Sequence, residues 1–285
     1  MAAGLVEVVS RLVRIPGVRG AWQRFPKGPL DLRARHDIWP RPHYGFGVWE
    51  AARLARALEV PRITVVEFGV AQGAGLLAME AIAAEVETHL GVAIDVVGFD
   101  TGQGLPPPAD YRDLPHFWSG GFYRMNEAAL RAKLRRARLI LGDVSDTVPP
   151  FLAQCAASPL AFVSFDLDYY TSTAVALRIF DGPSETHLPR VLSYFDDVIF
   201  PFEALLNEHV GEELAIREFN ARHAGGTSDV RQVTAVRGLS FVKNYRTFWH
   251  EQMYCFHHFS HPQYTVSVHP RVVQQRLAAR RPGPS

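Results

Sequence analysis

The sequence predicts an α/β fold, with a doubly wound, mostly parallel, Rossmann-like sheet that is covered by helices on both faces. The first observation is a set of short apolar segments, of which the β-branched run at 63–68 is the clearest. Such runs are typical of strands buried on both faces. The second observation is that segments with helical patterns separate these runs along the chain. This alternation indicates parallel strands joined by crossover helices.

The alternation defines the expected elements in order. Strands are expected at 63–68, 93–99, 138–141, 160–165 and 190–195, with two further candidates at 239–242 and 253–259 that would close the sheet. Helices are expected at 48–58, 75–88, 126–136, 148–155, 173–180 and 203–223.

Composition changes divide the chain into three expected regions. Residues 16–48 are rich in proline, glycine and aromatic residues, so we expect no long helix there and assign 1–60 to an N-terminal helical and irregular arm. The alternating region, 61–275, forms the main domain. The basic segment 276–285 ends in proline and glycine and is expected to be disordered.

Composition also restricts the partners and the compartment. The chain has 30 basic and 29 acidic residues, which provides no electrostatic reason to expect a nucleic-acid partner. No stretch approaches the roughly 20 apolar residues of a transmembrane helix. Cys155 and Cys255 lack metal-ligand spacing and indicate a reducing compartment, so we expect a cytoplasmic protein. The oligomeric state is left open, and a homo-oligomer is one alternative.

A glycine-rich turn follows the first strand. It reads Glu67-Phe-Gly69-Val-Ala71-Gln-Gly73-Ala-Gly75 and leads into a helix, a place where a ligand can approach the backbone and the positive helix end. A dinucleotide fingerprint fits residues 73–78 formally, but it begins several residues after the strand. The carboxylate of Glu67 would repel a pyrophosphate and could accept hydrogen bonds from a cationic amino-acid cofactor or from the loop amides. The pattern resembles the first motif of class I S-adenosylmethionine (SAM) methyltransferases.

Two further aspartates follow the next strands. Asp100 ends the second strand, where a carboxylate can accept hydrogen bonds from both ribose hydroxyls of an adenosine cofactor. Asp143 follows the third strand and is a candidate to lie near the adenine amino group. A helix cap at Ser145 or Asp146 explains the polarity around Asp143 equally well.

Acidic residues end the fourth and fifth strands. Asp166 follows one strand, and Asp196 and Asp197 follow the next, so adjacent parallel strands would bring all three to the same sheet edge. Clustered carboxylates repel one another, and Mg²⁺ would remove that conflict. Such a metal could hold two oxygens of an acceptor, and a nearby carboxylate could take the proton of its hydroxyl. Helix capping by Ser172 and Thr173 beside solvated aspartates is the alternative.

Together these motifs resemble the macrocin O-methyltransferase-like family of class I SAM methyltransferases. The matching segments are Glu67-Phe-Gly69-Val, Gly98-Phe-Asp100-Thr101, Gly104-Leu105-Pro106, Asp143 with Asp146-Thr147, Asp166-x-Asp168-x-Tyr170-x-Ser172-Thr173 and Phe195-Asp196-Asp197. The match spans roughly residues 60–200, so it implies the cofactor more directly than the acceptor.

The resemblance implies a seven-stranded sheet and a methyltransferase domain at 61–275. It also implies SAM as the cofactor and Mg²⁺-dependent O-methylation, in several members on a sugar hydroxyl. By position, the cofactor-binding residues would be Glu67, Gly69, Ala71, Gly73, Asp100 and Asp143. The metal ligands would be Asp166, Asp196 and Asp197, with Asp166 also a candidate base. The expected partner is a small-molecule acceptor such as a sugar.

Two other functions stay open at this point. An NAD(P)-dependent oxidoreductase is compatible with Asp100 and the glycines at 73–78, although no hydride-transfer set accompanies them. A non-catalytic protein that retains the fold is compatible with the weak match after residue 200. The histidine-rich segment 250–261 is interpreted as structural or as a pocket wall, with His257 or His258 as acid/base candidates if it is catalytic.

Overall fold

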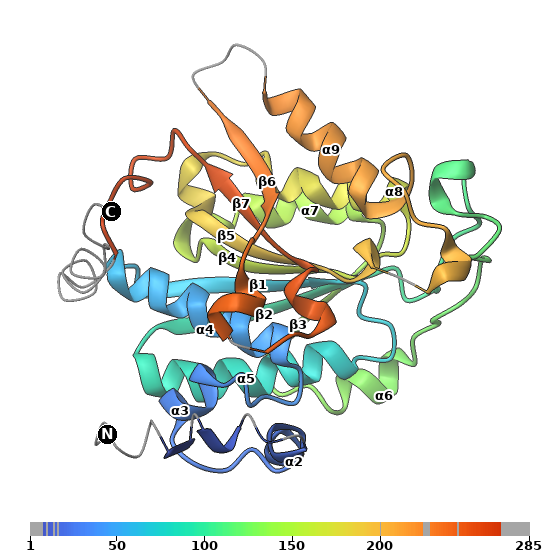
Figure 1. The fold of residues 1–285 in the computed structure, drawn as a ribbon. Coiled ribbons are helices and arrows are strands. Elements are labelled where there is room, and N and C mark those ends of the chain that lie inside the picture. The colour runs from blue at the N-terminus through green and yellow to red at the C-terminus, as the bar shows by residue number, and fades with distance from the viewer. Residues whose placement is uncertain are drawn as a thin grey trace, which may run out of the picture.

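The computed structural model describes residues 8–268 apart from 10, 14, 16, 200, 225–228 and 244. This described part of the chain forms one seven-stranded sheet in the order β3–β2–β1–β4–β5–β7–β6 (Figure 1). The strands are β1 (Arg62–Phe68), β2 (Ala93–Asp100), β3 (Arg138–Leu141), β4 (Leu160–Phe165), β5 (His187–Phe195), β6 (Arg231–Ala235) and β7 (Met253–His258). β1 to β5 are parallel, and β7 runs antiparallel to its neighbours β5 and β6. The predicted fold class is confirmed.

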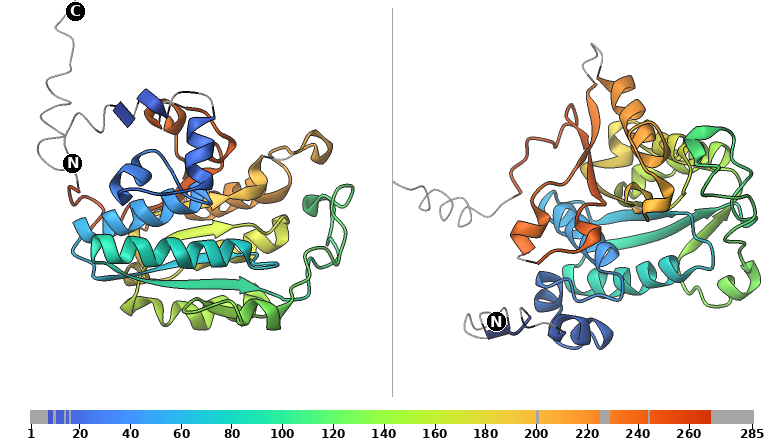
Figure 2. Two further views of the ribbon diagram at one scale, coloured as in Figure 1. Left: turned by 90° about the horizontal axis from the view of Figure 1, so that it is seen from below. Right: turned by 45° about the vertical axis from the view of Figure 1, so that its right-hand side comes forward.

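Helices cover both faces of the sheet. One layer contains α4 (Pro42–Ala57) and α5 (Ala74–Leu90), and the opposite layer contains α7 (Val144–Leu152), α8 (Tyr170–Ala176) and α9 (Gly211–His223) (Figures 1 and 2). The shorter helices are α2 (Val18–Arg24), α3 (Leu30–Arg35), α6 (Glu127–Arg131) and α10 (Leu239–Lys243). β4 is buried along its whole length because it lies between the two layers.

The N-terminal arm contains a long helix that the sequence analysis placed incorrectly. α4 begins at Pro42 rather than at residue 48. Proline is suited to the first helical position, since its missing N–H would have no partner there. Gly45 and Gly47 allow close packing, because an added Cβ would lie 2.0 Å from the Trp39 ring and 2.2 Å from the Phe162 ring. The glycines expected to disfavour a helix are therefore the residues that let it contact the sheet.

The C-terminal part also differs from the expectation. Residues 239–242, expected to be a strand, belong to α10, and the edge strand is β6 at 231–235. The expected helix at 203–223 forms only from Gly211 onwards. β7 agrees closely with the expected strand at 253–259. The tail expected to be disordered, 276–285, lies outside the described residues.

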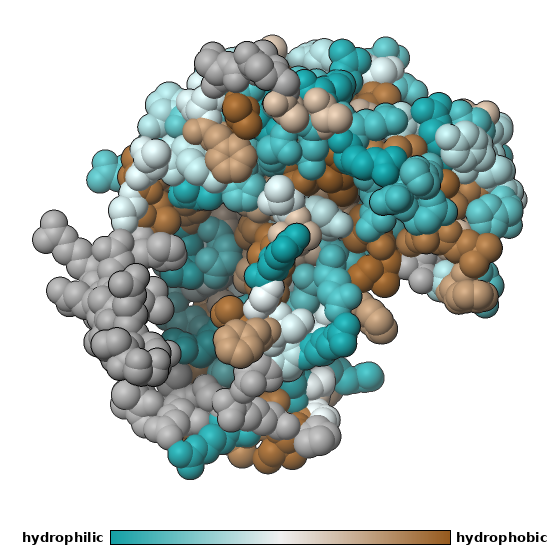
Figure 3. Space-filling model, turned by 45° about the horizontal axis from the view of Figure 1, so that its top comes forward, coloured by the Kyte–Doolittle hydropathy of each residue, from teal (hydrophilic) through white to brown (hydrophobic). Residues whose placement is uncertain are grey.

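The surface carries both hydrophilic and apolar residues. Figure 3 shows a face on which hydrophilic residues predominate and apolar ones are interspersed among them. Within the described ranges, no helix is both long and apolar enough to cross a membrane.

Candidate active site

The carboxyl ends of the parallel strands meet along one edge of the sheet. The register pairs Phe68 of β1 with Phe99 of β2 and with Phe165 of β4, and it pairs Phe165 with Phe195 of β5. The segments that follow these strands carry nearly all the residues expected to form the site. In open α/β sheets ligands bind outside this edge, so the predicted residues are brought to the expected place.

The turn after β1 has a left-handed backbone and lies against β4. Gly69 has φ 82°, and a Cβ at this position would lie 1.7 Å from the backbone oxygen of Asp166. Ala71 and Gly73 also have positive φ values, of 47° and 85°. Gly69 therefore permits both the turn and the close approach of two strand ends, a conformation that other residues adopt at a cost.

Asp100 at the end of β2 holds this turn in place. Its Oδ2 accepts hydrogen bonds from the amides of Val70, at 2.9 Å, and Ala71, at 2.8 Å. Its Oδ1 accepts one from the amide of Gly102 at 2.6 Å. A carboxylate offers about four acceptor positions, so the capacity left for ribose hydroxyls is small. The ribose-binding role of Asp100 stays a prediction, and its structural role is to order the loop.

Asp143 caps the helix that follows β3. It is the N-cap of α7, and its Oδ1 accepts a hydrogen bond from the amide of Ser145 at 2.7 Å. Hydrogen bonding from the side chain and the amide of Ser145 lowers the pKa of Asp143. The capping alternative is thus realised by Asp143 itself rather than by Ser145 or Asp146. No described residue donates a hydrogen bond to the other carboxylate oxygen, and contact with adenine stays a prediction.

Glu67 is a buried carboxylate with one oxygen that lacks a partner. Its side chain is 1% exposed, and Oε1 accepts a hydrogen bond from the Tyr44 hydroxyl at 2.6 Å. The hydroxyl of Ser164 donates to the Tyr44 oxygen at 3.2 Å. No described residue donates to Oε2. Burial raises the pKa of Glu67 to about 8, although Tyr44 and Arg41 act in the opposite direction. A buried polar oxygen of this kind is expected to have a donor in the functional state.

Five carboxylates gather where β4 and β5 end. They are Asp166, Asp168, Asp196, Asp197 and Glu212. Asp197 accepts a hydrogen bond from the amide of Asp168 at 2.9 Å, and Glu212 of α9 accepts one from the amide of Asp197 at the same distance. Asp196 accepts a hydrogen bond from the Tyr194 hydroxyl at 2.6 Å.

The cluster favours protonated carboxyl groups. Burial raises the pKa of Asp166 well above its usual range, and the charges of Asp196, Asp168 and Glu67 raise it further. Burial likewise raises the pKa of Asp168 to about 7, with a further contribution from Asp196. A positive charge placed here, or a proton, would relieve this repulsion.

The predicted magnesium site is not confirmed by this arrangement. The carboxylate chemistry suits a hard cation, but no group of three His, Cys, Asp or Glu side chains among the described residues is arranged to hold a metal ion. Asp197 already accepts a hydrogen bond from the Asp168 amide, and Asp196 accepts one from the Tyr194 hydroxyl. The three predicted ligands share one edge of the sheet without forming a ready coordination site.

The start of α4 contributes residues that the sequence analysis missed. Tyr44 contacts Glu67, and the His43 ring stacks on Tyr194, with ring centroids 4.2 Å apart. Burial lowers the pKa of His43 to about 3, and the charge of Arg41 contributes to this. The sequence signal was faint, since these residues lie in an arm more than 20 positions before the glycine turn. Glu212 was missed for the same reason, because it is distant in sequence from Asp197.

The C-terminal histidines lie at the other end of β5. His258 pairs with Asp229 at 2.6 Å, and its ring centroid lies 5.0 Å from that of His187 at the start of β5. His261 contacts the backbone oxygen of Ser184 at 3.0 Å. Asp196 follows the opposite end of the same strand, so these contacts favour the structural interpretation of the histidine-rich segment.

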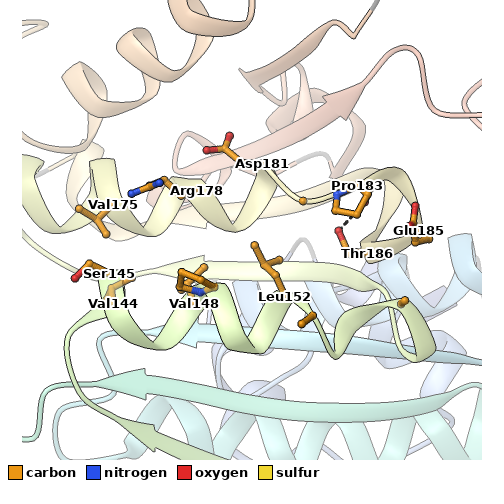
Figure 4. A pocket seen from close by; sticks show the side chains of 14 residues that line it. Val144, Ser145, Val148, Leu152, Val175, Arg178, Asp181, Pro183, Glu185 and Thr186 are labelled. Carbon is orange, nitrogen blue, oxygen red and sulfur yellow. Dashed lines mark hydrogen bonds between the residues drawn. The ribbon is translucent and has the colours of Figure 1, made fainter.

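A groove of about 390 Å³ lies beside the site rather than in it. It runs between α7 and the segment that joins α8 to β5, as Figure 4 shows. Val148 and Leu152 line one wall, and Val175, Arg178 and Pro183 line the other. Glu67, Asp100 and Asp166 are not among its lining residues, so it does not define the candidate active site.

Comparisons with known proteins give distant structural likenesses. No protein-family model matches the chain, and no curated protein matches it. The crystal structure of CalS11, a calicheamicin methyltransferase, has 22% identity and a TM-score of 0.47, with 75% of this chain and 82% of that chain covered. An apo structure of CalS11, described as a TDP-rhamnose 3'-O-methyltransferase, has 22% identity and a TM-score of 0.40, covering 75% and 83%.

A third likeness covers more of the chain at lower identity. The plantazolicin methyltransferase BpumL, in complex with a pentazolic desmethylPZN analog and SAH, has 10% identity and a TM-score of 0.37. The comparison covers 89% of this chain and 97% of that chain. At such identities and scores, the fold class of this chain rests on its own strand order and register.

Proposed function

We propose that this protein is a SAM-dependent O-methyltransferase that acts on a hydroxyl of a sugar or another small polar acceptor. The observation that carries the proposal is the buried Glu67, whose free Oε2 lies next to a left-handed glycine turn ordered by Asp100. SAM combines a cationic amino-acid group with an adenosine. The buried Glu67 and a second carboxylate, Asp100, at the ends of the adjacent strands β1 and β2 suit that combination.

The site residues would divide between the parts of the cofactor. Glu67 would face the amino-acid group, the turn containing Gly69, Ala71 and Gly73 would lie against the cofactor, and Asp100 would face the ribose. Asp143 would lie towards the adenine. These assignments follow the order of the segments along the sheet edge.

The reaction would be in-line methyl transfer. The acceptor oxygen forms a bond to the methyl carbon, the bond from that carbon to the sulfonium breaks, and the acceptor hydroxyl loses its proton. Asp166 is the candidate base, since it follows β4 next to the glycine turn and burial raises its pKa, which makes its carboxylate a stronger base. Alignment of donor and acceptor would supply much of the rate enhancement.

Two alternative functions make different predictions. An NAD(P)-dependent oxidoreductase would need a pyrophosphate near Gly75, where a Cβ would lie 1.8 Å from the carboxylate oxygen Oε1 of Glu67. This proximity disfavours a doubly anionic ligand at that place. A non-catalytic protein with the same fold would bind SAM without transferring its methyl group.

Calorimetric titration with SAM and its product SAH tests the cofactor directly. We expect micromolar binding by the wild type and at least tenfold weaker binding by Asp100→Asn, because loop order and ribose contacts are both impaired. Asp95→Asn, at the other end of β2, is the matched control and should bind normally. Absence of SAM and SAH binding by folded wild-type protein, or binding of NADH instead, would overturn the proposal.

Assistance by a divalent metal stays a separate prediction. If Mg²⁺ binds the carboxylate cluster, it should raise the unfolding temperature of the wild type at pH 8, where cluster repulsion is strong. It should not do so in Asp166→Asn. Equal methyl transfer in Mg²⁺ and in excess EDTA, with no thermal shift, would show that the reaction proceeds without the metal.

A further inference from the structure

Arg41 is a cation close to the candidate active site, with its guanidinium over the Tyr44 ring. It is the N-cap residue of α4 and is partly buried, but its side chain makes no capping hydrogen bond. No hydrogen bond or ion pair joins its guanidinium to another described residue. Guanidinium groups at such positions commonly bind carboxylates or phosphates through paired hydrogen bonds.

Tyr44 lies close to both Arg41 and Glu67. Its Cζ lies 5.5 Å from the centroid of the Tyr44 ring, and the Tyr44 hydroxyl lies 2.6 Å from Glu67 Oε1. The charge of Arg41 lowers the pKa of both Glu67 and Asp166, so its guanidinium is close enough to act on the carboxylates at the ends of β1 and β4. Nevertheless, Arg41 forms no ion pair within 4.0 Å of either carboxylate. A cation and a buried carboxylate oxygen, each without a hydrogen-bond partner among the described residues, therefore lie on either side of Tyr44 at one edge of the sheet.

A zwitterion is the ligand that satisfies both groups together. Glu67 Oε2 is buried without a donor among the described residues, and the partly buried Arg41 guanidinium has five N–H groups available for an acceptor. A free α-amino acid group offers an ammonium and a carboxylate on one carbon. A simple metal ion or a phosphate would satisfy one group and be repelled by the other. The N-terminal end of α4, with its partial positive charge, adds a favourable field for the carboxylate.

We propose that Arg41 binds the α-carboxylate of the methyl donor while Glu67 Oε2 accepts a hydrogen bond from its α-ammonium. The arm before β1 is then part of the cofactor site, with Tyr44 positioning Glu67. This inference rests on the proposed function, because it names residues that recognise the amino-acid end of the same cofactor.

Two ligands separate recognition of the amino-acid group from recognition of the nucleoside. S-adenosylhomocysteine carries the group, and 5'-methylthioadenosine lacks it. For Arg41→Gln we expect calorimetry to show about 10- to 100-fold weaker binding of S-adenosylhomocysteine, as for the loss of charge-assisted hydrogen bonds. Binding of 5'-methylthioadenosine should change less than about twofold. Arg41→Lys should retain part of the affinity, since it keeps the charge without the bidentate geometry.

Matched variants show whether the effect is local. Arg56→Gln changes an exposed arginine in the last turn of the same helix and should leave both affinities unchanged. Glu67→Gln should weaken S-adenosylhomocysteine selectively, as Arg41→Gln does. Unfolding temperatures of all variants establish that they are folded.

The outcomes distinguish this inference from the proposed function. If folded wild type binds neither ligand, both are overturned. If wild type binds S-adenosylhomocysteine and Arg41→Gln binds it equally well, only the role of Arg41 is overturned. The same holds if Arg41→Gln weakens both ligands equally, or if it raises only the KM for the acceptor, since Arg41 would then serve the nucleoside pocket or an anionic group of the acceptor.

Discussion

At the scale of single residues, the candidate site is built from groups with unusual constraints. Gly69 combines a positive φ with a close contact to β4, Asp100 accepts three loop amides, and Glu67 is buried with a free oxygen. The backbone at Gly69 would be strained for other residues, the Asp100 carboxylate is committed to the loop, and the buried Glu67 oxygen is costly unless a donor reaches it. Their occurrence together at one sheet edge is what distinguishes this place from an ordinary turn.

The contact at Gly69 predicts a large effect for a small substitution. Gly69→Ala should destabilise the fold by about 3 kcal/mol or more, because strain at positive φ is joined by a clash with the Asp166 oxygen. Gly91→Ala is the control, since Gly91 has φ 70° but open space around it, and should cost only about 1 kcal/mol. Urea denaturation measures both values. Equal costs would show that strand approach at Gly69 is unimportant.

At the scale of helices and strands, a side chain of one element fixes the turn that precedes another. Glu80 of α5 is 7% exposed, and its Oε1 accepts hydrogen bonds from the amides of Arg135, at 3.0 Å, and Ala137, at 2.6 Å. These amides precede β3, the strand that leads to Asp143. The buried side chain of Glu80 thereby orders the turn before β3, and β3 in turn positions Asp143, the residue expected to lie near the adenine.

This contact predicts the effect of neutralising Glu80. Glu80→Gln should lower the free energy of unfolding by about 1–3 kcal/mol, because an amide group cannot accept all of the hydrogen bonds that the buried carboxylate accepts. Glu127→Gln, which removes an exposed helical ion pair with Arg131, should change it by less than about 0.5 kcal/mol. Urea denaturation at pH 7 compares them, and similar values would contradict the ordering role of Glu80.

At the scale of the whole molecule, buried titratable groups couple stability to pH. Burial and mutual repulsion raise the pKa values of Asp166, Asp168, Asp197, Glu212 and Glu67, and the values for Asp168 and Glu67 are about 7 and about 8. In the unfolded chain carboxyl groups titrate near 4 and histidines near 6.5. Between pH 7 and 9 the folded state therefore holds protons that the unfolded state has lost.

The sign of this difference predicts an alkaline loss of stability. Because the native state binds more protons than the unfolded state, the free energy of unfolding falls as pH rises, by about 1.4 kcal/mol per pH unit for each extra proton. Urea denaturation at pH 7, 8 and 9 should show this fall. Asp168→Asn should reduce the slope, and asparagine tolerates the positive φ of 61° at this position. A slope that is flat or rises with pH in the wild type would contradict the prediction.

At acidic pH the buried histidines have the opposite effect on the free energy of unfolding. Burial lowers the pKa of His187 to about 3 and that of His250 to about 4. Stability that depends on neutral histidines is present above about pH 6.5 and is lost as pH falls towards these values. Below pH 6.5 the two sets of groups therefore oppose each other, which is why the alkaline range gives the clearer test.

The sequence by itself determined where β1 to β5 lie along the chain, to within a few residues, and which residues follow each strand. Runs of β-branched residues and alternating helices are local patterns, and parallel topology then brings the strand ends together. Asp100 and Asp166 were located in this way. The N-terminal helix was misplaced because glycines 45 and 47 read as disruptive in sequence, whereas in the fold they provide close packing against Trp39 and Phe162.

Only the tertiary structure decided how the side chains at that edge are used. Several contacts at that edge join segments that are distant in sequence. Tyr44 donates a hydrogen bond to Glu67, Arg41 lies over the Tyr44 ring, and Glu212 accepts a hydrogen bond from the Asp197 amide. Hydrogen bonding also decided that Asp143 caps a helix and that Asp197 accepts a backbone amide. Local patterns encode where a strand ends, but the direction and partners of a carboxylate depend on elements that pack against it from elsewhere in the chain.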